Sequence, residues 1–203
     1  MWYYNSQTIK TPKAMVINDI THPQGIFRDS ATLASLGIKP LRIVKPDSRY
    51  YWDGAYSVDA TGDEVVGTYA GTARDVATLK AGMLSKAKSA VASRHATIDW
   101  YWSRAAKGGT AVPSNIATYA TALYSEHETI KTAIAAITDL AGVIAYENKP
   151  HTETRKVKNT AENGDVTYGP ATTTGTRNID MCTHFTANPT DEVDPAFVSL
   201  VAD

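Results

Sequence analysis

The fold is decided by two stretches, residues 74–107, RDVATLKAGMLSKAKSAVASRHATIDWYWSRAAK, and residues 114–147, SNIATYATALYSEHETIKTAIAAITDLAGVIAYE. In both, apolar residues recur every three or four positions, which places them on one face of an α-helix. Asp75 and Ser114 can cap the N-termini, and Gly108 with Gly109 can end the first helix. The sequence therefore predicts two long helices joined by a short turn that contains Pro113.

The two apolar stripes are expected to face each other, because a connection of about six residues forces neighbouring helices to run antiparallel. The first stripe is interrupted at Arg94 and consists of Val76, Leu79, Met83, Ala87, Ala90 or Val91, Ile98, Trp102 and Ala105. The second stripe is more regular and consists of Ile116, Tyr119, Leu123, His127, Ile130, Ile134, Ile137, Ala141 and Ile144. We predict one long antiparallel helical hairpin over residues 72–147.

The flanking regions favour β-structure. Residues 1–71 contain short β segments divided by prolines and turns, with one short helix at residues 30–36 that Asp29 or Ser30 can cap, and we predict a small antiparallel β module. Residues 148–203 are polar and rich in Thr, and their Asn163-Gly164 pair is typical of a β-hairpin turn. We predict a C-terminal β-hairpin arm at residues 148–203, and an α+β fold class for the whole chain.

Composition excludes several classes of protein. A formal charge of −1 and a pI near 6.5 give no overall attraction to nucleic acid or anionic lipid. No apolar run approaches the roughly 18 residues that would cross a bilayer, and the first residues lack the pattern of a signal peptide. With Cys182 as the single cysteine, an internal disulfide is impossible. We therefore expect a soluble protein, made in a cytoplasm, that binds neither nucleic acid nor membrane and has protein partners.

Candidate catalytic or metal-binding residues are few and isolated. The sequence has no P-loop, dinucleotide glycine motif, nucleophile elbow or paired-His zinc helix. His95 with Asp99, His127 beside two glutamates, and Cys182 with His184 each have a spacing that could serve a metal or an acid–base pair. The first pair lies at the sparse end of the apolar stripe, His127 occupies a position in the second stripe where an interface histidine is favoured, and Cys182 with His184 lacks a third ligand, so we interpret all of them as structural. The expected protein is not an enzyme and uses no cofactor or metal.

Consecutive aromatic residues indicate contact surfaces. On a helix, residues 100–102 span about 200°, more than one packing seam can bury, so part of this cluster is expected to contact the β region or another chain. Packing entirely within the protomer is the alternative. Residues 155–158 could serve nucleic acid, but lysines on an edge strand that block aggregation are the favoured interpretation. The candidate protein–protein interface residues are Trp100, Tyr101, Trp102, Tyr119, His127, Trp2, Tyr3, Tyr4, Arg155, Lys156 and Lys158.

Residues 84–123 carry a family resemblance. A helix with Asp99, Trp100 and Arg104 is followed by a small-residue turn at residues 110–113 and by a helix with Tyr119 and Leu123. This order is similar to the "D-W-x-x-x-R" helix, Pro-containing turn and "Y-R-x-x-L" helix of phage tail-fibre assembly proteins. Residues 36–41 also resemble the short N-terminal β module of that family. The chain departs from the pattern in having Ala in place of Arg at position 120, and in continuing through residues 148–203.

The resemblance implies a function in tailed bacteriophages. A β-rich C-terminal extension suits a virion subunit that adds strands to its neighbours, so we expect a structural component of the tail, at the baseplate or the tail-fibre attachment region. Its partners would be other phage tail proteins within a larger assembly that includes further copies of the chain. It would be located in the virion tail after synthesis in the bacterial host cytoplasm. The alternative is a non-virion tail-fibre assembly chaperone.

Overall fold

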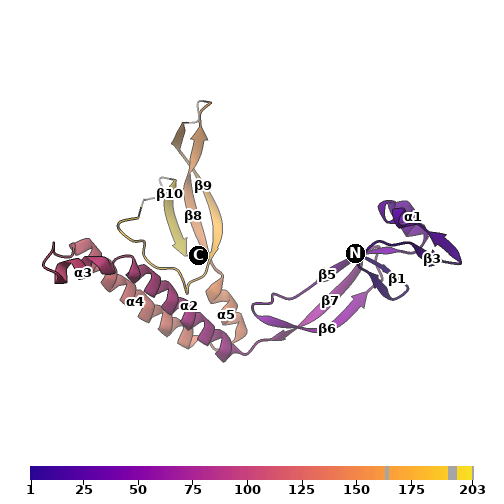
Figure 1. Cartoon of the computed structure of the whole chain (residues 1–203), viewed down its shortest axis with the longest axis horizontal. Coiled ribbons are helices and arrows are strands. Elements are labelled where there is room, and N and C mark those ends of the chain that lie inside the picture. The colour runs from indigo at the N-terminus through magenta and orange to yellow at the C-terminus, as the bar shows by residue number, and fades with distance from the viewer. Residues whose placement is uncertain (163–164, 192–195, 203) are drawn as a thin grey trace. The chain divides into compact units, whose positions relative to one another are not determined.

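The chain divides into two compact units, Met1–Arg74 and Asp75–Asp203. The computed structural model describes residues 1–162, 165–191 and 196–202. In Figure 1 the first unit is coloured indigo to purple, and the helices and sheet of the second unit run from magenta to yellow. The α+β fold class agrees with the sequence prediction, and the predicted segment 148–203 lies entirely within the second unit.

The first unit is built on a five-stranded sheet with the strand order β2-β1-β5-β7-β6, and a separate pair, β3-β4. The strands are β1 Trp2–Tyr4, β2 Gln7–Ile9, β3 Met15–Ile17, β4 Ile20–His22, β5 Lys39–Val44, β6 Tyr51–Asp59 and β7 Val65–Ala73. The 3₁₀-helix η1 (Gln24–Arg28) and helix α1 (Ser30–Ser35) lie between β4 and β5 in the chain. The core under these elements contains Ile17, Phe27, Leu33 and Ile38.

Local sequence explains the turns and the short helix of this unit. The β1–β2 and β3–β4 connections place Asn5 with Ser6 and Asn18 with Asp19 at positive φ, the conformation of tight two-residue hairpins that Asn and Asp tolerate best. The Asp29 carboxylate accepts hydrogen bonds from the backbone of Ala31 and Thr32, which confirms Asp29 as the cap of α1.

The prediction of a purely antiparallel N-terminal module is wrong. Strand β7 lies between β5 and β6 and pairs in parallel with β5, with Leu41 opposite Val65, while its pairing with β6 is antiparallel. The sheet is therefore mixed. Turn signals identify consecutive strands that can form a hairpin, but they carry no information on a parallel neighbour that lies across an intervening strand.

The prediction of one long antiparallel helical hairpin over residues 72–147 is also wrong. This region forms four helices, α2 Val76–Ala96, α3 Asp99–Ala106, α4 Ser114–Ala136 and α5 Leu140–Glu147. The chain also contains three sheets, so helices and strands make up comparable shares of its described residues. The most extensive helix–helix contact is between α2 and α4, while α3 and α5 are separate short helices with smaller contacts to α2.

Both helix interruptions have a local cause. At Thr97 and Ile98 the Thr97 hydroxyl donates to the Arg94 carbonyl at 2.7 Å, while the Ile98 side chain is fully buried. At Ile137 the backbone becomes extended, and Lys80 donates to its carbonyl at 2.7 Å. The Asp139 carboxylate then accepts from the Gly142 backbone at 2.8 Å and begins α5. The apolar period runs across both interruptions, so the period alone does not locate them.

Helix α4 supplies most of the core of the second unit. Its buried residues are Ile116, Tyr119, Ala120, Leu123, Ile130 and Ile134. Helix α2 contributes Met83, Ala87 and Val91, and α3 has no buried residue. The seam between α2 and α4 is therefore thin, because one of its sides consists of a few, partly small, side chains.

The C-terminal arm is a sheet, not the predicted two-stranded β-hairpin. Strands β8 (Lys149–Thr160), β9 (Val166–Ile179) and β10 (Phe197–Ala202) are antiparallel in the order β10-β8-β9. The predicted Asn163-Gly164 turn lies outside the described residues. We call β8, β9 and β10 the C-terminal sheet.

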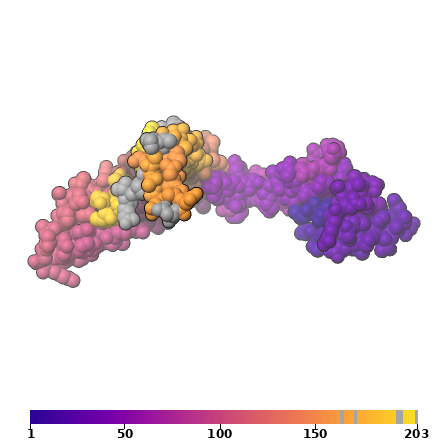
Figure 2. Space-filling view, turned by 90° about the horizontal axis from the view of Figure 1, so that it is seen from above, coloured from indigo at the N-terminus to yellow at the C-terminus, as the bar shows by residue number. Residues whose placement is uncertain are grey.

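The segment after β9 lies against the helices of the same unit. The Glu126 carboxylate accepts from the backbone and the hydroxyl of Thr186, and the Asn188 amide donates to Thr97 at 3.2 Å. Figure 2 shows residues of this part of the chain, in yellow, against the helices, in pink. A segment too poor in apolar residues to build its own core thus uses the helices as its support.

Candidate protein–protein interface

Helix α3 presents aromatic side chains to solvent. Trp100 is 50% exposed and Trp102 is 40% exposed. The rings of Trp100 and Tyr101 stack with centroids 3.8 Å apart, and the Arg104 guanidinium lies over both rings, 4.8 and 5.4 Å from their centroids. We call these four residues the α3 aromatic surface. Trp, Tyr and Arg are the side chains that contribute most to binding energy in protein interfaces.

The exposure of this surface follows from the short helix. Three consecutive aromatic residues cannot all face α4, and α3 ends after eight residues, before a longer packed face can form. The chain then turns at Gly108, whose φ of +81° suits glycine. A Cβ at Gly109 would lie 2.9 Å from the Arg104 carbonyl oxygen, so this turn folds tightly onto α3.

The aromatic residues of β1 belong partly to the core of the first unit. The rings of Trp2 and Phe27 meet edge to face with centroids 4.9 Å apart, and Trp2 and Tyr4 pack against the core cluster. Tyr3 is half-buried on the same strand. These contacts account for the partial burial of Trp2 and Tyr4 within their own unit, and an interface function of Trp2, Tyr3 and Tyr4 stays a prediction.

Tyr119 and His127 lie on α4 in different surroundings. Tyr119 is 4% exposed, and burial raises the pKa of its phenol, so it packs in the core of its own unit. The side chain of His127 is 19% exposed, with Nδ1 3.9 Å from a Glu128 carboxylate oxygen. The structure does not bring either residue to the α3 aromatic surface, and their interface function stays a prediction.

The basic residues of β8 lie on the middle strand of the C-terminal sheet. Arg155 donates to Glu153 at 2.8 Å and is opposite Phe197 of β10 and Thr173 of β9. The Lys156 backbone donates to Ala196, and Lys158 lies farther along, opposite Tyr168. Arg155 is therefore not on an edge strand, which the interpretation of these residues as edge protection had assumed.

The outer strands of the C-terminal sheet carry exposed apolar side chains. Phe197, Val198 and Val201 of β10 are 41%, 45% and 60% exposed, and Val166 of β9 is 45% exposed. Within the described residues, no further strand pairs with the outer edge of β9 or β10. An open edge beside apolar side chains is the surface to which another chain can add a strand.

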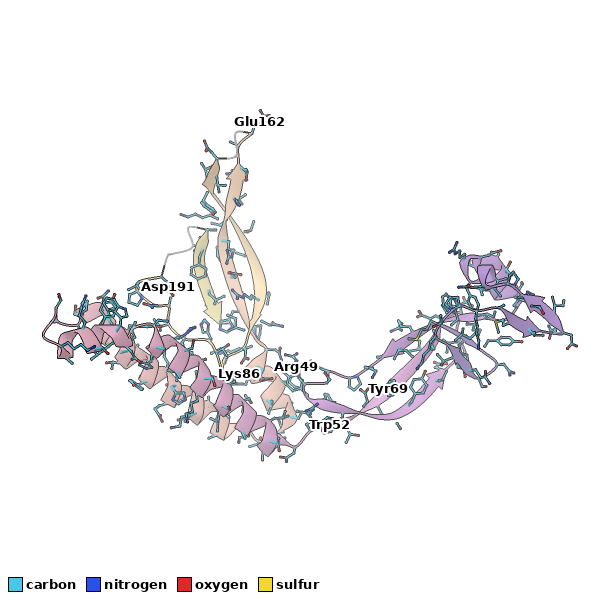
Figure 3. The ribbon with its side chains drawn as sticks, in the orientation of Figure 1. Arg49, Trp52, Tyr69, Lys86, Glu162 and Asp191 are labelled. Carbon is cyan, nitrogen blue, oxygen red and sulfur yellow. The ribbon has the colours of Figure 1, made fainter. Side chains whose placement is uncertain are left out.

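One cluster of potential metal ligands is already occupied by a lysine. Ligand atoms of Glu147, Asp180 and Cys182 lie within 4.8 Å of one another. The Lys86 ammonium is 2.7 Å from Glu147 and 2.9 Å from Asp180, and Figure 3 shows it on α2 near the base of the C-terminal sheet. Burial opposes its charge, but these two carboxylates raise the pKa of Lys86 above its ordinary value. The cluster joins α2, α5 and the segment after β9 through charge.

Cys182 is built into this cluster as a neutral thiol. It is fully buried, and its backbone donates to Asp180 at 2.9 Å. Burial, followed by the charge of Asp180, raises the pKa of the Cys182 thiol to about 12. The sequence offers Cys182 with His184 only as a candidate pair, which we interpret as structural, and in the structure the His184 ring lies beside the buried ring of His151, with centroids 5.9 Å apart.

Cys182 is predicted to resist thiol reagents in the folded protein. A rise in pKa from 9.0 to about 12 lowers the thiolate fraction at pH 8 about a thousandfold, and burial blocks approach. Reaction with a chromogenic disulfide is expected to take hours in buffer and seconds in concentrated urea. Equal rates in the two solvents would contradict the buried position.

The remaining candidate pair, His95 with Asp99, is not assembled as a site. The His95 ring stacks on Tyr124 with centroids 4.3 Å apart, and Asp99 lies in the first turn of α3. Sequence reasoning missed the cluster around Lys86 altogether, since its members come from α2, α5 and the segment after β9. No local spacing signals such a contact.

Comparison with protein-family models, with curated proteins and with solved structures found no match to this chain. No helix in the described part of the chain is both long and apolar enough to cross a membrane. Fold and function are accordingly inferred from the chain's own residues.

Proposed function

We propose that the chain is a structural component of a bacteriophage tail, in the baseplate or tail-fibre attachment region, and that it binds neighbouring protein subunits. The α3 aromatic surface is the observation that carries this proposal, because its two exposed Trp side chains, one of which contacts the Arg104 guanidinium, gain much from burial by a partner. The resemblance of residues 84–123 to tail-fibre assembly proteins supplies the biological setting.

The C-terminal sheet gives the second contact in this proposal. A neighbour that adds a strand to β9 or β10 would gain main-chain hydrogen bonds, with the exposed valines of β10 as the apolar part of the contact. The chain would form a homo-oligomer with other tail proteins around it, and it would reside in the virion tail after synthesis in the host cytoplasm.

The proposal is tested on washed phage particles. Mass spectrometry should find the chain in a fixed ratio to other tail proteins, and the isolated protein should be oligomeric in sedimentation. If the chain is absent from particles while a fibre protein is soluble only when it is co-expressed, the chain is an assembly chaperone. The family resemblance favours that function as the second candidate.

The double replacement Trp100→Ala and Trp102→Ala is predicted to reduce incorporation into particles at least tenfold. Loss of a single interface Trp commonly costs 2 kcal/mol or more, which corresponds to roughly thirtyfold in affinity. Incorporation is measured by mass spectrometry after complementation of a phage that lacks the gene. Tyr124→Ala is the matched control, because it removes an aromatic ring that is 63% exposed on α4. Equal losses for the two variants would contradict the assignment of the contact to α3.

A further inference from the structure

A small polar pocket of about 300 Å³ lies between α2, the end of β9 and β10. It is lined by two arginines, Arg94 and Arg177, together with Asn178, Asp180, Thr183 and His184. All of these residues belong to the second unit. None of them belongs to the α3 aromatic surface or to the outer strand edges, so the proposed function does not use this pocket.

The two guanidinium groups at the pocket are poorly neutralised. Arg94 donates to the Thr183 carbonyl at a long 3.4 Å and lies 5.4 Å from the ring centroid of Phe185, and its buried Nε has no hydrogen-bond partner among the described residues. Arg177 lies 3.7 Å from the Glu153 carboxylate, beyond hydrogen-bond distance, while Arg155 holds the same oxygen at 2.8 Å. Both arginines thus retain donors for another acceptor.

The carboxylate that lines the pocket is already engaged. One oxygen of Asp180 accepts from the Lys86 ammonium at 2.9 Å, and the other accepts from the Cys182 backbone at 2.9 Å. Asp180 therefore neutralises Lys86 first. Within the described residues, neither Arg94 nor Arg177 has a carboxylate at hydrogen-bond distance.

His184, which also lines the pocket, lies in a positive electrostatic environment. Burial is the largest cause that lowers the pKa of His184, followed by the neighbouring His151 on β8. Arg94 of α2 and Arg177 of β9 lower it further, and Glu126 of α4 opposes them. The imidazole therefore responds to the same positive potential that would attract an anion.

We propose that this pocket binds an oxyanion, a phosphate or carboxylate group of a small ligand, between Arg94 and Arg177. The planar guanidinium is the side chain best suited to such groups, because it can donate two parallel hydrogen bonds to two oxygens of one anion. The volume of the pocket fits a small group, and the Arg177 side chain that lines it is 60% exposed to solvent.

The test is a titration of the full chain with inorganic phosphate, and separately with acetate, at constant ionic strength set by chloride. Saturable heat in calorimetry, or saturable shifts of the His184 imidazole in NMR spectra, is expected for one or both anions. A bound anion offsets the two guanidinium charges, so the pKa of His184 should rise when the site is filled. No saturable binding of either anion, or an unchanged His184 pKa, would overturn the proposal.

Arg177→Met removes one charge from the lining of the pocket and keeps an apolar stem. Affinity is expected to fall about tenfold or more, the effect of losing one charge-assisted hydrogen bond. Lys88→Met is the control, because Lys88 is an exposed cation on α2 that does not line the pocket. If both variants weaken binding equally, the anion responds to general surface charge and the site does not exist. Since the Arg177 side chain is largely exposed, this variant tests the pocket without depending on the more buried Arg94.

Discussion

Leu123→Ala is expected to lower the free energy of unfolding of the second unit by about 3 kcal/mol. Leu123 is fully buried on α4, and α2 meets this helix with small side chains such as Ala87. A thin seam has few neighbours that can move into the space of a deleted isobutyl group, so most of the cavity should remain. The loss would be a large part of the stability of a domain of this size.

Urea unfolding followed by far-UV circular dichroism measures this loss, because the long helices belong to the second unit. Leu84→Ala is the matched control on α2, where the side chain is 37% exposed, and it should cost less than about 1 kcal/mol. A similar loss for both variants would contradict the packing of α4 described above. Any separate transition of the first unit should be unchanged, since Leu123 belongs to the second.

The buried face of α4 was predictable from sequence because its signal is local. Ile116, Tyr119, Leu123, Ile130 and Ile134 recur at helical spacing, and all five are buried. Only residues on the same helix are needed to recognise this stripe, and burial of one continuous face stabilises it wherever the partner helix lies. Capping preference, another local signal, offers Asp29 or Ser30 as the cap of α1, and the structure selects Asp29.

The interruption between α2 and α3 was not predictable, because it depends on distant residues. Periodicity continues through Ile98 to Trp102, which suggested one helix, yet Ile98 is buried at the junction and Trp102 is 40% exposed. The Thr97 hydroxyl at this junction also accepts from Asn188, more than ninety residues away in the chain. The spacing of apolar residues along the chain cannot predict such a contact.

Strand partners were missed for a related reason. The parallel neighbour of β5 is β7, and β10 reaches β8 after β9 has intervened. Hairpin signals describe strands that are adjacent in sequence, whereas these two pairings are fixed by which sheet face each strand can bury. The pocket between Arg94 and Arg177 has the same origin, since three distant segments form it.

Stability of the second unit is expected to fall steeply between pH 9 and pH 12. The unfolded Cys182 thiol ionises near 9.0, and burial raises its pKa to about 12 in the folded chain. The folded state therefore holds this proton more tightly, so its contribution is complete below pH 9.0 and disappears as the pH approaches 12. A shift of about three pH units corresponds to roughly 4 kcal/mol.

Tyr146 and Lys86, two neighbours of Cys182, also lower the stability of the fold as the pH rises. Burial is the main cause that raises the pKa of Tyr146 from 10.0 to about 12, so its contribution is lost above pH 10.0. The carboxylates of Glu147 and Asp180 raise the pKa of Lys86 above 10.5 although burial opposes this, and its ion pairs stabilise the fold until the pH passes that value. Alkali therefore weakens one structure, the cluster that joins α2, α5 and the segment after β9.

Urea unfolding at intervals between pH 7 and pH 11 measures this dependence, and Cys182→Ala separates the thiol from its neighbours. The variant should lose about 1 kcal/mol at pH 7 from the small cavity. Its stability should then decline less than that of the wild type between pH 9 and pH 10, where the thiol contributes most to the loss, and should fall more steeply above pH 10 with Tyr146 and Lys86. If the stability of variant and wild type changed with pH in the same way, the pKa of Cys182 would be the same in the folded and the unfolded chain, and this result would contradict the prediction. Complete burial beside the Asp180 carboxylate is the reason to expect a higher pKa in the folded chain.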